Sequence, residues 1–305
     1  MLYLCATPIG NLGDISERVI ETLKAVDVIA AEDTRQTIKL LNHFDIKKQM
    51  IAYHEHNRYE MTPVLVERML AGEDIALVTD AGTPAISDPG EDLVRACREA
   101  GVAVTSLPGA TAFTTALTLS GMSARRFTFE GFLPQDKKEQ RAVLERLRDT
   151  TVTTIFYEAP HRLVKTLEVL AEAVGAAAAG VAASRGSAGA DGAPGEAGSG
   201  VSRAVTVCKE LTKKHEWSMR FDSLADAVAY FTDVEEPRGE FVLVIEGCDR
   251  EELEAREKQA WQEMTLDEHM EIYLSQGIEK KEAMRLVAKD RGVSKREVYQ
   301  ALLKN

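Results

Sequence analysis

The sequence predicts an α/β protein of two domains, over residues 1–122 and 123–248, with a small helical extension over residues 249–305. Short apolar runs alternate with segments of helically spaced apolar residues, which is typical of a largely parallel sheet with helices on both faces. The length of 305 residues exceeds what one small core needs. The extension has an acidic first part and a basic second part. Residues 251–277 hold 2 basic and 8 acidic residues, while residues 278–305 hold 8 basic and 4 acidic residues.

Composition limits the class of protein. Hydrophobic residues make up 45% and charged residues 28%, as in a folded soluble protein, and the net charge of -12 argues against a broadly basic surface. Any contact with nucleic acid must therefore come from local patches. The four cysteines lie far apart in or beside apolar runs, so we expect buried thiols: Cys5, Cys97, Cys208 and Cys248. No apolar run approaches the roughly 18 residues that span a bilayer, and residues 1–10 lack the pattern of a signal peptide, so we expect a cytoplasmic protein.

The first domain is expected to alternate strands and helices in order. Strands are predicted at residues 2–6, 28–31, 51–53, 76–78 and 102–104, and helices around residues 19–26, 40–44, 64–70 and 93–97. Either Ser16 or Asp14 can cap the first helix. Polar loops then gather at one edge of the sheet: residues 7–14, 32–35, 54–57, 79–90 and 106–112.

The stretch ALVTDAGTPAISDPG, residues 76–90, is the centre of this domain. It begins as a buried strand and becomes a turn with two glycines, two prolines, two aspartates and three hydroxyls. Ordinary strand-to-helix connections have only about two to six residues, so a turn of this length predicts a ligand site. Neither G-x-G-x-x-G nor a P-loop is present. His54 and His56 lack further ligands at metal-binding spacing, so we expect no metal site.

The second domain is predicted to begin with an aromatic strand after Arg125 and Arg126. Further strands are expected at residues 151–157, 204–208 and 241–245, and helices from residue 137, from residue 163 and around residues 224–231. Residues 175–203 hold 8 glycines and 10 alanines among 29 residues, so they cannot bury a core and are predicted to be a flexible surface loop.

The extension is predicted to start with a charged helical linker over residues 251–262. Helices over residues 280–289 and 295–303 flank a Gly-Val-Ser turn in which Ser294 can cap the second helix, an arrangement typical of a helix-turn-helix. The basic end could contact phosphate; the alternative is a helical pair that only packs on the body of the protein.

Seven ordered motifs resemble one family: TPIGNLGD, AEDTR, VTDAGTPAISDPG, LPGATA, GFLP, YEAPHR and KELTKKHE. They are similar to the S-adenosylmethionine-dependent ribosomal RNA small subunit methyltransferase I family of the tetrapyrrole methylase superfamily. The resemblance covers residues 1–248, and the segment 175–203 is longer than expected there. It implies a tetrapyrrole-methylase-like fold with a mixed second sheet, S-adenosylmethionine in the cleft between domains, and a homodimer. The implied reaction is 2′-O-ribose methylation of a cytidine in the decoding region of 16S ribosomal RNA.

The resemblance also implies a set of site residues. The cofactor site should include Pro8, Gly82, Thr83, Ile86, Ser87, Thr111, Ala112, Phe132 and Tyr157. A ribose hydroxyl is a poor nucleophile, so Glu32 or Glu158 is hypothesised to assist its deprotonation. Phosphate is hypothesised to contact Arg35, Arg162 and Lys209, together with Lys295 and Arg296 in the extension. For each of these charged residues the alternative is an ion pair that only holds loops together.

Two other functions remain open. One is methylation of a small tetrapyrrole, and the other is RNA binding without catalysis on the same fold. The basic extension and the pairs Arg125-Arg126 and Lys137-Lys138 favour RNA as the substrate, because a tetrapyrrole would not require them.

Overall fold

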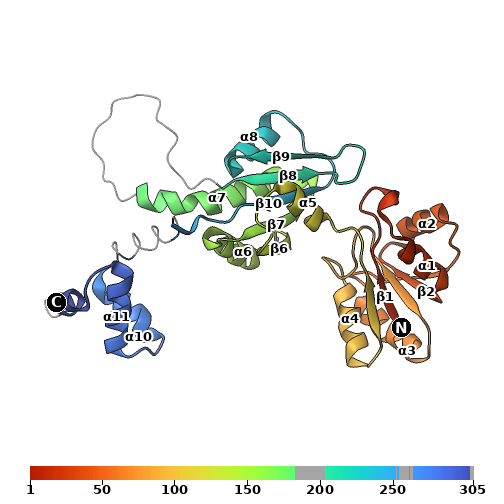
Figure 1. Ribbon diagram of the computed structural model, residues 1–305, viewed down its shortest axis with the longest axis horizontal. Coiled ribbons are helices and arrows are strands. Elements are labelled where there is room, and N and C mark those ends of the chain that lie inside the picture. Colours follow the sequence, from red (N-terminus) through yellow and green to blue (C-terminus); the bar gives the residue numbers. More distant parts are fainter. Residues whose placement is uncertain (183–202, 252, 254–260, 262–263, 303–305) are drawn as a thin grey trace. The chain divides into compact units, whose positions relative to one another are not determined.

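The computed structural model describes residues 1–182, 203–251, 253, 261 and 264–302 (Figure 1). The chain divides into two compact units. The first unit comprises residues 1–147 and 152–246, and the second comprises residues 148–151 and 247–305. The domain boundary predicted near residue 122 falls inside the first unit and stays a prediction.

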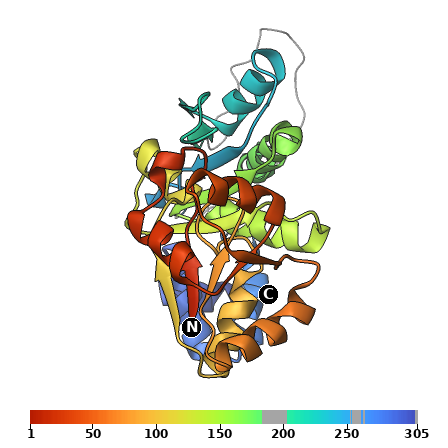
Figure 2. The same ribbon diagram turned by 90° about the vertical axis from the view of Figure 1, so that its right-hand side faces the viewer.

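The first unit contains a five-stranded parallel sheet of order β3-β2-β4-β1-β5. Its strands are β1 (Leu2–Cys5), β2 (Val28–Ala31), β3 (Gln49–Ala52), β4 (Ile75–Val78) and β5 (Val104–Leu107). Its helices are η1 (Leu12–Asp14), α1 (Glu17–Ala25), α2 (Thr34–His43), α3 (Arg58–Leu70) and α4 (Gly90–Glu99). We call this sheet with its helices the first lobe; Figure 2 shows it facing the viewer in red to orange.

Two hydrophobic clusters cover the two faces of this sheet. Leu65 of α3 and Leu93 of α4 pack on one face, while Leu23 of α1 and Leu41 of α2 pack on the other. Successive residues of a strand point to opposite faces, so each strand supplies both clusters. The helices therefore lie on both faces, as predicted. Ser16 is the residue that caps α1, since its Oγ accepts a hydrogen bond from the Val19 amide at 3.3 Å.

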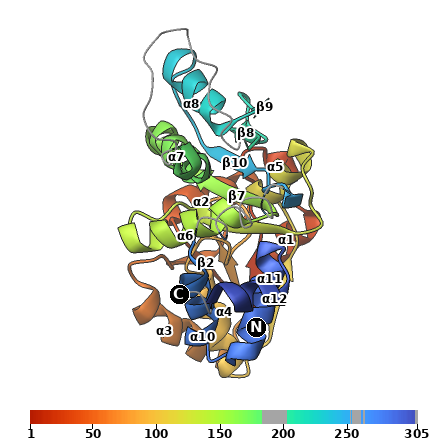
Figure 3. The ribbon, with the colours of Figure 1, turned by 90° about the vertical axis from the view of Figure 1, so that its left-hand side faces the viewer.

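The second lobe is a mixed five-stranded sheet of order β6-β7-β10-β8-β9. Its strands are β6 (Phe127–Phe132), β7 (Thr153–Glu158), β8 (Val205–Lys209), β9 (Trp217–Phe221) and β10 (Phe241–Ile245). Its helices are α5 (Ala112–Ser120), α6 (Lys137–Asp149), η2 (Pro160–Arg162), α7 (Leu163–Ala182) and α8 (Leu224–Asp233), several of which are labelled in Figure 3. Only β6 and β7 pair in parallel; the other three pairings are antiparallel.

Three features of this lobe differ from expectation. Helix α5 was not predicted, and it falls in the segment that was expected to end the first domain. Strand β9 was not predicted, because it is an edge strand whose central residues Ser218, Met219 and Arg220 are exposed and carry no apolar run. The prediction of a loop over residues 175–203 is wrong for residues 175–182, which continue α7. Alanine is the best helix former, so the alanine-rich start of this segment extends the helix that precedes it. Residues 183–202 lie outside the described residues.

Among its described residues, the second unit contains the helices α10 (Leu266–Ser275), α11 (Lys280–Arg291) and α12 (Lys295–Leu302). They enclose a small core that includes Met270, Val287 and Val298. Gly292, at φ +66°, ends α11, and Ser294 caps α12 by accepting from the Glu297 amide at 3.2 Å. Most of the predicted linker over residues 251–262 lies outside the described residues. None of the helices in the described part of the chain is both long and apolar enough to cross a membrane.

Candidate active site

A cavity of about 620 Å³ lies within the first unit. Both lobes line it, at the points where β2, β4 and β7 end. Its volume falls in the range of roughly 300 to 1,000 Å³ that small-molecule sites occupy. In the described part of the chain, no cluster of three or more His, Cys, Asp or Glu side chains is arranged to hold a metal ion.

The loop over residues 79–90 has a strained backbone that Asp88 holds in place. Ala85 and Ser87 adopt the left-handed region at φ +68° and +62°, which is unfavourable for residues with a side chain. The Asp88 carboxylate accepts hydrogen bonds from the amides of Ala85 at 3.0 Å, Ile86 at 3.2 Å and Gly90 at 2.8 Å. Burial raises the pKa of Asp88, and these amide donors oppose that effect. The loop therefore has a fixed shape before any ligand binds.

Gly82 connects this loop to the loop that follows β1. Its backbone pairs with Thr7 through two hydrogen bonds of 2.9 and 3.1 Å, at a φ of +90° that glycine adopts without strain. Thr83 Oγ1 donates to the Ala110 carbonyl at 3.0 Å and lies 2.8 Å from Thr111 Oγ1. Three strand-end loops of the first lobe are thus joined into one floor for the cavity.

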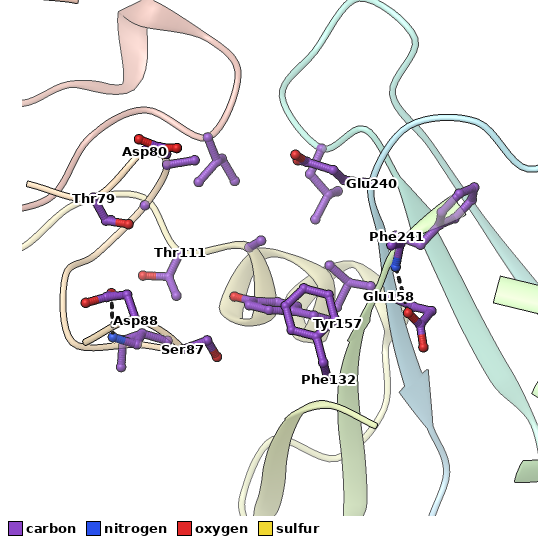
Figure 4. A pocket seen from close by; sticks show the side chains of 18 of the residues that line it. Thr79, Asp80, Ser87, Asp88, Thr111, Phe132, Tyr157, Glu158, Glu240 and Phe241 are labelled. Carbon is purple, nitrogen blue, oxygen red and sulfur yellow. Dashed lines mark hydrogen bonds between the residues drawn. The ribbon is translucent and has the colours of Figure 1, made fainter. Parts of the chain in front are cut away.

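Phe132 and Tyr157 form an aromatic wall that the second lobe contributes. Their ring centroids lie 5.8 Å apart, and Phe132 keeps 49% of its surface exposed. The Tyr157 hydroxyl accepts from the Phe113 amide at 3.2 Å, and burial raises the pKa of this tyrosine. Figure 4 shows the two rings between Ser87 and Thr111 on one side and Phe241 on the other. This wall offers an apolar surface to a flat ligand group.

Carboxylates dominate the charge of the cavity. Five carboxylates line it: Glu32, Asp80, Asp88, Glu158 and Glu240. None of the described residues that line the cavity is a lysine or an arginine. Burial, reinforced by the charge of Glu32, raises the pKa of Asp80. A cationic ligand would relieve this repulsion, so the cavity suits a small molecule with positive charge and an apolar part.

Glu32 lies at the end of β2, where its Oε2 accepts from Thr79 Oγ1 at 2.5 Å and from the Asp80 amide at 3.2 Å. Glu158 is more fully engaged. Its side chain is 0% exposed; Oε2 accepts from Thr166 Oγ1 at 2.5 Å, and Oε1 accepts from the Ala159 amide at 2.8 Å and lies 3.5 Å from Arg162 Nε. Figure 4 shows its carboxylate turned away from Asp80 and Thr111.

Within the first unit, protein groups bind three of the cations that were predicted to contact phosphate. Arg162 donates to the Leu133 carbonyl at 2.6 Å, and Lys209 pairs with Glu235. Arg35 is 88% exposed but binds Asp33 through two hydrogen bonds of 3.0 and 2.8 Å. Lys295 and Arg296 are exposed at the start of α12, in the second unit.

Of the nine predicted cofactor residues, all but Pro8 line the cavity: Gly82, Thr83, Ile86, Ser87, Thr111, Ala112, Phe132 and Tyr157. Pro8 lies between Thr7, which pairs with Gly82, and Ile9, which lines the cavity. Sequence reasoning did not assign Asp80 or Glu240 to the site, although both line it. His161, which the motif YEAPHR places at a strand end of the predicted cleft, lines it as well. Asp80 and His161 belong to motifs that the sequence marks, whereas nothing local marks Glu240, which reaches the cavity because β10 lies beside β7.

Curated relatives match this chain over nearly its whole length. The ribosomal RNA small subunit methyltransferase I of Halalkalibacterium halodurans is 44% identical over 98% of this chain and 93% of its own. The protein of the same name from Bacillus subtilis is 43% identical over 99% of this chain and 93% of its own. The family model described as Tetrapyrrole (Corrin/Porphyrin) Methylases matches residues 1–190.

Solved structures agree on the fold. A conserved hypothetical protein from Aeropyrum pernix K1 has a TM-score of 0.60 at 17% identity, covering 100% of this chain and 96% of that one. A uroporphyrin-III C-methyltransferase from Thermus thermophilus, complexed with S-adenosylhomocysteine, has a TM-score of 0.50 at 15% identity, covering 80% of this chain and 96% of that one. The predicted two-sheet α/β fold of the tetrapyrrole methylases is confirmed. The chain is a methyltransferase whose cofactor is S-adenosylmethionine, and it belongs to the ribosomal RNA small subunit methyltransferase I family.

Proposed function

We propose that the protein methylates the ribose 2′-hydroxyl of a cytidine in the decoding region of 16S ribosomal RNA. The observation that carries the proposal is the cavity between the parallel and mixed sheets, which eight of the nine family-matched cofactor residues line. The names of the full-length relatives support small-subunit ribosomal RNA as the substrate class.

The cavity fits the cofactor by charge and by shape. S-adenosylmethionine supplies a methyl group on a positively charged sulfur, which the surrounding carboxylates favour over a neutral or anionic ligand. Phe132, Tyr157 and Ile86 offer apolar surface to the adenine, and the fixed loop over residues 79–90 offers backbone groups to the methionine end. Holding reactants in position can supply roughly 7 to 11 kcal/mol of the barrier, so alignment is the main task of these residues.

Glu32 is the carboxylate that we assign to the proton of the ribose hydroxyl. Its Oε1 has no hydrogen-bond partner among the described residues, while Oε2 is held by Thr79 and Asp80. One oxygen is thus fixed and the other is available to accept a proton or a hydrogen bond. Glu158 has both oxygens engaged inside the second lobe, so we assign it a structural role.

RNA would be held by exposed cations rather than by Arg162 or Lys209, both of which are tied to protein groups. Lys295 and Arg296 at the start of α12 are exposed, and neither has a hydrogen bond or ion pair with any described residue. Arg35 is exposed three residues after Glu32, which lines the cavity. We further propose that the protein acts as a homodimer in the cytoplasm, where ribosomal subunits are assembled.

The test compares small ribosomal subunits from cells with and without this protein. Mass spectrometry of 16S ribosomal RNA fragments should find a 2′-O-methylcytidine that is absent without the protein. Purified protein and S-adenosylmethionine should restore the mark on the unmodified subunits. A mark on a base instead of a ribose, or no difference between the two cell types, would contradict the proposed reaction. Sedimentation of the purified protein tests the homodimer.

A further inference from the structure

The loop over residues 209–216, which we call the KELTKKHE loop, has no role in the function proposed above. It is rigid although it lacks regular structure. Glu210 and Thr212 adopt the left-handed region at φ +49° and +65°. Lys213 Nζ ties the loop by binding Glu210 Oε1 at 2.8 Å and Glu240 Oε2 at 2.9 Å. Backbone conformations of this cost persist only where neighbouring contacts impose them, so the loop is held in a defined shape.

This shape is anchored to the second lobe. The Glu210 amide donates to the Glu240 carbonyl at 2.9 Å, and the Glu240 amide donates back to Glu210 Oε1 at 2.9 Å. A Cβ at Gly239 would lie 2.5 Å from Glu210 Cγ, so only glycine allows this approach. The KELTKKHE loop therefore moves together with β8 and β10.

Its far side rests on the loop after β1 of the first lobe. The Asn11 amide donates to Thr212 Oγ1 at 3.0 Å. A Cβ at Gly10 would lie 2.4 Å from Lys213 Cγ, 2.7 Å from Thr212 Oγ1 and 3.1 Å from the Leu211 carbonyl oxygen. Gly10 does not adopt a positive φ, so what excludes a side chain there is the neighbouring loop and not the backbone conformation.

The same contact closes part of the cofactor cavity. Ile9 and Leu211, the residues next to Gly10 and Thr212, are 8% and 5% exposed and belong to one hydrophobic cluster. Both also line the cavity. Whatever separates the two loops must therefore open the cavity wall between Ile9 and Leu211.

We propose that Gly10, Asn11 and Thr212 form a latch between the lobes that positions Ile9 and Leu211 on the bound cofactor and slows its release. The hydrogen bond from Asn11 to Thr212 and the apolar cluster that includes Ile9 and Leu211 hold the latch, so it can open and close while each loop keeps its own shape. These residues are positioning residues, and they act through Ile9 and Leu211. The inference depends on the cofactor and not on the identity of the RNA.

The first test measures cofactor release from the full-length protein without RNA. Protein loaded with tritiated S-adenosylmethionine is mixed with excess unlabelled S-adenosylmethionine and sampled by rapid filtration. Gly10→Ala should release the label about tenfold faster than the original protein. Gly13→Ala is the matched control, because its new Cβ would meet only the Asn11 side chain, at 3.2 Å or more. Equal release rates for the two variants would overturn the latch.

A second pair of variants tests the hydrogen bond alone. Thr212→Ser keeps the oxygen that accepts from Asn11, and Thr212→Ala removes it. Loss of one such bond should speed release about fivefold in Thr212→Ala and leave Thr212→Ser close to the original rate. The idea fails if both variants release the label at the original rate. Failure of the original protein to retain the label would instead contradict the cofactor assignment, and a missing RNA mark would leave these rates unaffected.

Discussion

Two glutamates, Glu32 and Glu158, follow or end strands whose tips meet the same cavity, yet their surroundings differ. Glu32 in the first lobe is half-buried, and hydrogen bonds reach one of its two oxygens. Glu158 in the second lobe is 0% exposed, and donors hold both of its oxygens. A carboxylate at a strand end can thus serve chemistry or hold a loop, and its hydrogen-bond partners distinguish the two roles.

The same contrast separates the predicted cations. Lys209 lies against Glu235 and the Trp217 ring, and Arg162 lies against Glu158 and the Leu133 carbonyl. Lys295 and Arg296 are exposed to solvent. Groups of the second lobe that belong to recognisable motifs are thus tied into the fold, while Lys295 and Arg296 of the helical extension are exposed.

The largest effect is expected at the buried glutamate. Glu158→Ala leaves Thr166, Arg162 and the Ala159 amide without their common partner, which should lower the free energy of unfolding by about 3 kcal/mol. Denaturant unfolding measures this change. Glu99→Ala, at an exposed position on α4, is the control and should change stability little. If Glu158→Ala had normal stability but no methylation activity, Glu158 would serve the chemistry and would not have the structural role assigned to it.

The next effect should appear in the reaction rate. Glu32→Gln keeps the shape and one acceptor of the side chain but removes its charge, so single-turnover methylation should slow about 100-fold. Stability should change little, because the hydrogen bonds from Thr79 and Asp80 can remain. An undiminished rate would show that Glu32 does not accept the proton of the ribose hydroxyl, and this role would then belong to another group that lines the cavity.

A smaller effect is expected in RNA affinity. Replacing both Lys295 and Arg296 with alanine should weaken RNA binding and reduce the salt slope of log affinity by about 2, one unit for each lost phosphate contact. Lys209→Ala is the comparison, since that ammonium is already paired with Glu235. RNA binding curves at several salt concentrations measure this slope. An equal loss of slope in the double variant and in Lys209→Ala would show that the exposure of a cation does not identify the phosphate contacts.

The smallest effect concerns pH. Hydrogen bonds from Arg35 lower the pKa of Asp33 from 3.8 to about 2. A depressed pKa stabilises the fold above the unfolded value, and this contribution is lost as the pH falls from about 4 to about 2. The original protein should therefore lose more thermal stability over that window than Arg35→Met. Arg98→Met, at an exposed arginine of α4, should behave like the original protein, and identical curves for all three would contradict the assignment.

Sequence reasoning predicted the parts of the fold that local pattern determines. The buried strands β1, β2, β4 and β10 are short apolar runs, and a run of this kind needs no partner to be recognised. Strand β9 could not be predicted, because an edge strand pairs on one side only and can carry polar residues on its exposed face. The start of the Gly/Ala-rich segment is helical because alanine favours a helix, whereas the overall composition of the segment indicates a loop.

The candidate site divides in the same way. Residues such as Gly82 and Thr111 could be predicted through the family resemblance, while the glycines, prolines and hydroxyl side chains of the loop over residues 79–90 indicated only that a ligand binds there. Glu240 could not be found, because its place depends on which strands pair. The partners of Lys209 and Glu158 were equally hidden, since Glu235 and Thr166 come from other elements of the fold.

Binding of S-adenosylmethionine to Gly82 variants tests the central claim most directly. Gly82 and Gly101 both adopt a positive φ, at +90° and +74°, but only Gly82 lines the cavity. Gly82→Val and Gly101→Val should therefore carry similar backbone strain. Calorimetry should find that Gly101→Val binds S-adenosylmethionine as the original protein does and that Gly82→Val binds it at least about tenfold more weakly. Equal affinity in the two variants would contradict the claim that this cavity holds the methyl donor.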